Sequence, residues 1–176
     1  MEGHEPPFGG ELVRHYLRDL VYGANDGIIT TFAVVSGVAG ASLGSRTVLI
    51  LGAANLLADG FSMGASNFLS IRSEEAVRRS RGDGVAEPFP ARHGLATAAA
   101  FCLAGVVPLV PYVVSTGPHR FAVAVVATLL TLFAVGALRA AVVQLRWWIA
   151  GAEMLLVGAL AAAVSYGVGR LVAGLA

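Results

Sequence analysis

Five long apolar segments constrain this sequence more than any other feature. Each is long enough to cross the hydrocarbon core of a membrane, which takes about 20 residues in a helix. The segments cover residues 20–43, 47–71, 93–114, 121–143 and 148–174. None shows the alternation of polar and apolar residues that a membrane β-barrel requires. The sequence therefore predicts an all-α integral membrane bundle of five transmembrane helices.

The composition agrees with a membrane protein and excludes several other classes. Hydrophobic residues make up 56% of the chain and charged residues only 13%, whereas soluble domains carry about 25% charged residues. The net charge of +1, without a basic patch, argues against a nucleic-acid partner. Cys102 is the only cysteine, so the chain can form no internal disulfide and offers no structural zinc site.

The polar stretches divide the chain into a tail, a bundle and one loop. Residues 1–19 lack the pattern of a secretory signal peptide, and we expect a cytoplasmic tail that leads into an amphipathic stretch. Residues 20–176 form the predicted transmembrane domain, interrupted by a short cytoplasmic loop at 72–92. Pro108 and Pro111 are expected to kink the third segment near its outer end.

The arginines predict the orientation. With the N-terminus in the cytoplasm, nine arginines fall inside and only three fall outside, which satisfies the positive-inside rule. Five crossings then place the C-terminus on the opposite side. The compact loops favour a prokaryotic inner membrane, or a vacuolar-type membrane if the protein is eukaryotic.

Small residues recur along the first segment and let helix backbones approach closely. The pattern comprises Ala33, Ser36, Gly37, Gly40 and Gly44. It fits either packing within one bundle or a subunit interface. Because five thin helices rarely enclose a polar pathway alone, we expect a homodimer.

Three acidic residues fall inside the predicted spans: Asp26, Asp59 and Glu153. Placing a charge at the centre of a membrane helix costs at least about 2.5–3.5 kcal/mol, so such residues face protein or water and usually serve a function. The alternative is a structural ion pair, with Arg139 or, for Glu153, with Arg146. For Asp26, close to the boundary, plain solvation is a further alternative.

A polar stripe with a spacing of four residues runs along the second segment. It comprises Asn55, Asp59, Met63 and Asn67. This spacing places the four side chains on one helix face, and Glu74 and Glu75 continue it into the loop. A core stripe would instead consist of Leu or Val. With a rise of about 1.5 Å per residue, Asp26 and Met63 are expected at one level, with Asp59 one turn deeper.

These side chains suit a divalent transition metal. Carboxylate and amide oxygens bind hard or borderline ions, and a thioether favours Fe²⁺ over Mg²⁺ and Ca²⁺, with Mn²⁺, Co²⁺ and Zn²⁺ close behind. Buried carboxylates also exchange protons when a cation arrives or leaves. The candidate metal ligands are Asp26, Asp59, Met63, Asn67 and Glu74, and the candidate proton pathway comprises Asp26, Asp59 and Glu153.

Four stretches together resemble the vacuolar iron transporter family. They are YGANDGIITTFAVVSGVAGA (22–41), LADGFSMGASNFLSIRSE (57–74), PFPARHGLATAAAFCLAGVVPLVPY (88–112) and GAEMLLVGALAAAVSYGVG (151–169). The resemblance implies a dimeric five-helix transporter that exports Fe²⁺, often with Mn²⁺, from the cytoplasm in exchange for protons. It implies a pathway at the dimer interface lined by the first two helices. The family's pore aspartate and methionine fall on Asp26 and Met63.

Two features depart from the family pattern. Many members have a glutamate where this chain has Asn67, and an amide cannot titrate. Plant and fungal-type members also carry a long glutamate-rich domain between the second and third membrane helices, which collects iron in the cytoplasm. This chain resembles the short form that lacks that domain. Glu74 and Glu75 are then either a reduced substitute or exposed acids at a helix end.

The remaining residues suggest no other chemistry. The four histidines, His4, His15, His93 and His119, fall in predicted tails, interfacial stretches or loops, and no metal role is expected for them. No nucleophile–base set is present, so the chain is not expected to be an enzyme and needs no cofactor. The expected partners are metal ions, protons, lipid and a second copy. The alternative function is a non-transporting membrane scaffold or assembly subunit whose polar residues are interhelical packing contacts.

Overall fold

The computed structural model describes residues 8–84, 87–143 and 146–175. Within these ranges the regular structure is entirely helical, which confirms the predicted all-α class. The elements are α1 (Phe8–Gly40), α2 (Ser45–Ser80), α3 (Pro90–Gly105), the 3₁₀ turn η1 (Val107–Leu109), α4 (Val110–Val114), α5 (Arg120–Val143) and α6 (Trp147–Ala173). The first seven residues of the predicted tail, with His4, lie outside the described residues.

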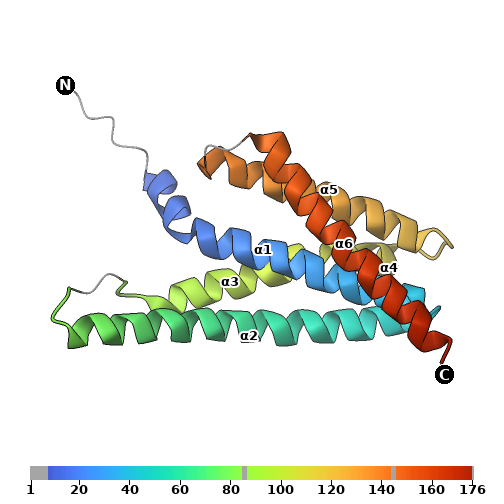
Figure 1. Ribbon diagram of the computed structural model, residues 1–176, viewed down its shortest axis with the longest axis horizontal. Coiled ribbons are helices and arrows are strands. Elements are labelled where there is room, and N and C mark those ends of the chain that lie inside the picture. The colour runs from blue at the N-terminus through green and yellow to red at the C-terminus, as the bar shows by residue number, and fades with distance from the viewer. Residues whose placement is uncertain (1–7, 85–86, 144–145, 176) are drawn as a thin grey trace.

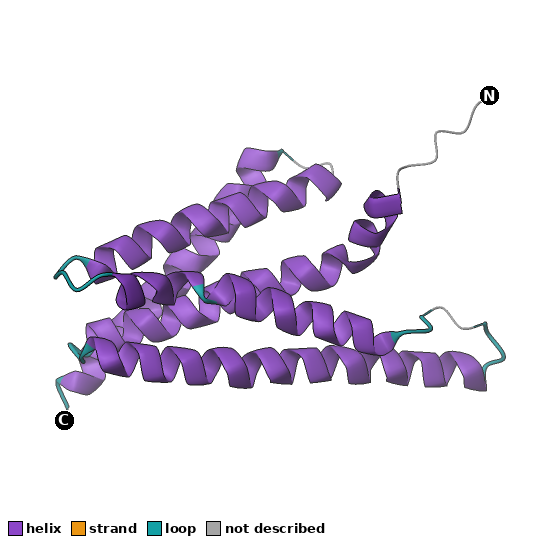
Figure 2. Ribbon diagram, turned by 180° about the vertical axis from the view of Figure 1, so that it is seen from behind, coloured by secondary structure: helices purple, strands orange, loops and turns teal. Residues whose placement is uncertain are grey.

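The helices run lengthwise along the molecule, with connections at its two ends (Figure 1). The start of α1, the α2–α3 loop and the α5–α6 connection lie at one end, called here the N-terminal end. The α1–α2 turn, the α4–α5 loop and the end of α6 lie at the opposite end, as the view from behind also shows (Figure 2). In the described chain α1, α2, α5 and α6 each form one pass between the two ends, and α3, η1 and α4 together form another.

Four of these passes are long and apolar enough to span a membrane: Ser45–Ser80, Pro90–Val114, Arg120–Ala140 and Trp147–Ala173. The prediction of five apolar spans is thus confirmed for four of them in the described chain. The helix α1 is not among them, because Asn25, Asp26 and neighbouring threonines dilute its apolar residues. It nevertheless packs against both α3 and α6 along its length, so it belongs to the same bundle.

The small residues of α1 are used for packing within the chain. A Cβ atom added at Gly27 would collide with the backbone of Phe101 on α3, and one added at Gly40 would collide with the backbone of Tyr166 on α6. At Gly37 an added Cβ would lie 2.8 Å from Ser165 Oγ. These contacts correspond to the first interpretation of the small-residue pattern, which is packing within one bundle.

The third pass is interrupted, as its prolines predict. The helix α3 ends at Gly105, and η1 follows from Val107 to Leu109 before α4 resumes at Val110. Pro108 lacks the N–H group that a continuous helix needs. By contrast, α2 continues to Ser80, beyond the predicted end at 71. The extension is rich in arginine and glutamate, which favour helices.

The outer faces of the helices are apolar. Phe61 and Leu103 are each 77% exposed, and many aliphatic side chains share this exposure. An apolar surface of this extent is typical of a protein surrounded by lipid or by a partner. The interior includes a cluster of Ile28, Leu132 and Met154 from α1, α5 and α6.

Candidate functional site

A polar cavity of about 430 Å³ lies between α1 and α2, toward the N-terminal end. Its lining comprises Arg18, Asp19 and Tyr22 from α1 and Ser62, Met63, Ser66, Asn67 and Ser70 from α2. Space is available here because α1 packs closely on α3 and α6 but makes far fewer contacts with α2. Two residues of the predicted stripe, Met63 and Asn67, therefore face this cavity.

The polar residues of α1 and α2 pair level by level along the antiparallel helices. Asn67 Nδ2 donates a hydrogen bond to Asp19 Oδ1 at 2.8 Å. One turn deeper, Tyr22 and Met63 both line the cavity. One further turn along each helix come Asp26 and Asp59, which the register of the Asn67–Asp19 pair brings to about the same level. We call these three pairs the α1–α2 polar ladder; in it Asp26 is level with Asp59, one turn away from the level predicted with Met63.

Polar atoms without protein partners lie beside the inner end of this ladder. Asn25 Oδ1 and Asn55 Nδ2 are buried and have no hydrogen-bond partner among the described residues. The Thr30 hydroxyl donates to the Asp26 carbonyl at 2.8 Å, so it is already used. Buried polar groups in native proteins are normally satisfied by protein, water or an ion. Asn25 Oδ1 therefore has an acceptor free for water or a cation, and Asn55 Nδ2 a donor free for water.

Two candidate residues lie away from the cavity. Glu74 is exposed on the last turns of α2, as the interpretation of Glu74 and Glu75 as exposed helix-end acids expects. For Glu75 that interpretation is wrong, because Glu75 is only 5% exposed and accepts a hydrogen bond from the N–H of Glu87. Glu153 on α6 forms an ion pair with Arg139 on α5, with 3.0 Å between Oε2 and Nη2 and a side chain that is 58% exposed. This is the structural ion pair named above as the alternative for the intramembrane acids.

A buried polar network, which no local pattern in the sequence predicts, extends from the cavity to α3. Asn67 Nδ2 also donates to Thr97 Oγ1 at 2.8 Å. On the other side of Asp19, its Oδ2 lies 2.5 Å from His93 Nδ1. Asp19 and His93 are both only 7% exposed, so protein groups rather than solvent satisfy most of their hydrogen-bonding atoms. His93 is therefore buried in α3, and the expectation of a peripheral histidine is wrong.

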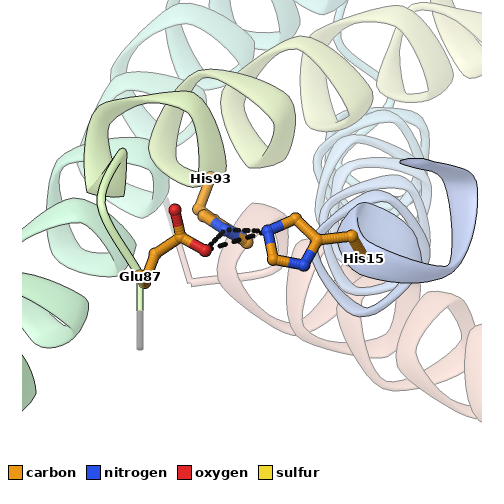
Figure 3. A group of neighbouring side chains, drawn as sticks. All are labelled: His15, Glu87 and His93. Carbon is orange, nitrogen blue, oxygen red and sulfur yellow. Dashed lines mark hydrogen bonds and ion pairs between the residues drawn. The ribbon is translucent and has the colours of Figure 1, made fainter. Parts of the chain in front are cut away.

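His93 also belongs to a compact group with His15 and Glu87 (Figure 3). Glu87 Oε2 lies 2.9 Å from His15 Nε2 and 3.0 Å from His93 Nε2. Burial alone would raise the pKa of Glu87, but hydrogen bonds from the Phe89 N–H and from His93, and the charges of the two imidazoles, lower the pKa below its ordinary value of 4.5. No local motif signals this group, because its members come from α1, the α2–α3 loop and α3.

These features define a class: a multi-pass helical membrane protein with a polar cavity beside an intramembrane carboxylate pair. The sequence matches the VIT family model over residues 17–83 and 82–170. The chain belongs to the VIT family, as its motifs predict.

Curated relatives support this membership over most of the chain. "Vacuolar iron transporter homolog 1" of Arabidopsis thaliana is 31% identical over 166 residues, which cover 89% of this chain and 83% of the relative. "Vacuolar iron transporter homolog 5" of rice is 32% identical over 168 residues, covering 89% and 80%. "Vacuolar iron transporter" of Toxoplasma gondii is 28% identical over 223 aligned positions, covering 89% and 74%.

Proposed function

We propose that this protein moves a divalent transition metal, Fe²⁺ and/or Mn²⁺, out of the cytoplasm in exchange for protons. The observation that carries the proposal is the α1–α2 polar ladder: Asp19, Asn67 and Met63 line a cavity in an otherwise apolar bundle, and Asp26 and Asp59 follow one turn beyond that lining. Relatives named as vacuolar iron transporters support metal as the cargo. The chain would thus belong with metal transporters rather than with membrane scaffolds.

Asp26, Asp59 and Met63 are the proposed ligands of the ion in transit. Two facing carboxylates repel each other when empty and are stabilised by a divalent cation between them. Met63 adds a polarisable sulfur, which favours Fe²⁺ over Mg²⁺ and Ca²⁺. Asn67 also lines the cavity, and its side-chain amide donates a hydrogen bond to Asp19.

Proton exchange follows from the same pair. When the cation leaves, one of the two carboxylates gains stability by taking up a proton, since two like charges at close range cannot both remain ionised at low cost. Release of that proton then accompanies the binding of the next cation. Asp26 and Asp59 are therefore proposed to bind metal and protons in alternation.

The N-terminal end is proposed to face the cytoplasm. The C-terminal turns of α2 and the start of α3 lie at this end (Figure 1), and they carry five arginines on the two sides of the α2–α3 loop. These arginines are Arg72, Arg78, Arg79, Arg81 and Arg92. Basic residues at one end of a helical membrane protein favour a cytoplasmic location of that end.

A homodimer is proposed to complete the pathway. Ser62 and Ser66, which line the cavity from α2, are exposed beside the stripe. The contacts between α1 and α2 are few, so one chain alone does not surround the ladder. A second copy against α2 would close it from the lipid.

Transport by purified protein in proteoliposomes tests the proposal. With an imposed pH gradient, the unaltered protein should drive Fe²⁺ and Mn²⁺ across the bilayer, and the proton movement should be metal-dependent. Asp26→Asn and Asp59→Asn should each reduce the initial rate by at least about tenfold, a loss of about 1.4 kcal/mol. Met154→Leu, a substitution in the core cluster of α1, α5 and α6, is the matched control. Full rates in both aspartate variants would refute the assignment, and no transport by the unaltered protein would favour a scaffold.

A further inference from the structure

Two imidazoles and one carboxylate converge at the N-terminal end of the bundle. His15 comes from α1, Glu87 from the α2–α3 loop and His93 from the first turn of α3, and their ligand atoms lie within 4.8 Å of one another. The two Nε2 atoms are 3.2 Å apart, and each lies close to Glu87 Oε2, at 2.9 and 3.0 Å. Figure 3 shows the three groups directed toward one another.

The spacing of these three atoms fits a tetrahedral metal site. Metal–ligand bonds of about 2.0–2.1 Å place neighbouring ligand atoms about 3.3 Å apart. The observed separations of 2.9, 3.0 and 3.2 Å are slightly smaller. An ion bonded to all three would therefore lie about 1 Å outside their plane, and a small outward movement of one ring would complete the geometry.

The neighbouring groups orient the three ligands. Asp19 Oδ2 lies 2.5 Å from His93 Nδ1, so that nitrogen carries a proton, and a bound cation would replace the Nε2 proton that His93 shares with Glu87 in the empty group. A carboxylate on the far nitrogen is the usual arrangement behind a metal-binding histidine. The N–H of Phe89 donates to Glu87 Oε1 at 2.8 Å, which leaves Oε2 for the cluster. Glu87 is also held through its own N–H, which donates to Glu75 Oε1 at 2.9 Å.

The site is open on one side. The side chain of His15 is 51% exposed, whereas those of His93 and Glu87 are only 9% and 13% exposed. Three protein ligands with an open position are typical of sites that exchange a water or a ligand, whereas closed structural sites have four. Two imidazoles with one carboxylate also select Fe²⁺, Co²⁺ or Zn²⁺ over Mg²⁺ and Ca²⁺.

We propose that His15, Glu87 and His93 form a binding site for a divalent transition-metal ion, and that it holds the cargo before the ion enters the α1–α2 cavity. Asp19 links the two places, because it contacts His93 and also lines the cavity. The metal site stands independently, and only its role in loading rests on the proposed transport.

Binding of Co²⁺ to the tag-free full chain in detergent tests the site. Visible absorption reports nitrogen ligation of Co²⁺, and titration gives its affinity in the presence of excess Mg²⁺. His15→Gln and Glu87→Gln should each weaken the nitrogen-ligated site by about tenfold or more. His119→Gln, at an exposed histidine in the loop of the opposite end, is the matched control and should bind like the unaltered protein. Unchanged affinity in both cluster variants would overturn the site; because His15 is exposed, its variant should fold normally.

Transport assays separate the loading role from the site itself. In proteoliposomes, His15→Gln should raise the half-saturating Fe²⁺ concentration by about tenfold with little change in the maximal rate, as expected for loss of binding before a common path. An unchanged half-saturating concentration despite lost Co²⁺ binding would overturn the loading role. Absence of transport by the unaltered protein, with Co²⁺ binding intact, would remove the proposed function and leave the metal site in place.

Discussion

The side-chain amide of Asn67 on α2 donates one hydrogen bond to Asp19 on α1 and another to Thr97 on α3, each over 2.8 Å. One residue thus joins three helices at the mouth of the cavity. The amide is a donor that neutralises part of the field of the buried Asp19.

Asn67→Asp keeps the size of the side chain but replaces the donor with a second carboxylate beside Asp19. We expect the free energy of unfolding to fall by about 1–3 kcal/mol at pH 8, because hydrogen bonds are lost and like charges face each other. Thermal unfolding in detergent at pH 8 measures the loss. An unfolding midpoint equal to that of the unaltered protein would contradict this account of Asn67.

Met63→Leu tests the thioether as a selectivity element. Leucine keeps the volume and removes the soft ligand, so the Fe²⁺ transport rate should fall by about tenfold while the Mn²⁺ rate falls less. Met154→Leu makes the same exchange in the buried core and should leave both rates unchanged. Equal losses for the two metals in Met63→Leu would show that Met63 shapes the cavity without binding the ion.

Gly27→Ala tests the close packing of α1 on α3. The added methyl group would collide with the backbone of Phe101, which cannot move aside as a flexible side chain could. We expect a loss of about 1–3 kcal/mol in stability, the usual range for overpacking. Gly167→Ala on α6 is a matched control, because nothing lies within 4 Å of its added Cβ. Similar unfolding midpoints for the two variants would contradict the packing described here.

Glu153→Gln distinguishes the two interpretations of the acid on α6. Its exposed pair with Arg139 spans 3.0 Å between α5 and α6, and Glu153 does not line the α1–α2 cavity. We therefore expect transport and its pH dependence to remain within about twofold of the unaltered protein, and stability to fall by less than about 1 kcal/mol. A shifted pH dependence of transport would instead support a proton path through Glu153.

The sequence predicts those parts of the molecule that depend on local patterns. The apolar runs identify the helices, Pro108 interrupts the third pass where expected, and the four-residue spacing of Asp59, Met63 and Asn67 places them on one face of α2. The exact level of Asp26 depends on how far two helices slide past each other, which local spacing does not determine.

The contacts of His93 could not be predicted in this way. Its partners are Asp19, 74 positions away, and His15, 78 positions away. Such a group forms only when α1 and α3 pack with their ends together, and no spacing within either helix reports that packing. The burial of a histidine at the first turn of an apolar helix is similarly a result of tertiary structure.

The unbroken length of α2 has a mechanical consequence. From Ser45 to Ser80 the helix contains no interruption, and at about 1.5 Å per residue it extends about 54 Å, well beyond a hydrocarbon layer of about 30 Å. Asp59 and Glu75 therefore lie on one continuous helix and move together. A tilt of α2 away from α1 would widen the α1–α2 cavity and would also move Glu75 away from the loop that contains Glu87. Release of an ion from the proposed His15–Glu87–His93 site and opening of the cavity would then be one movement.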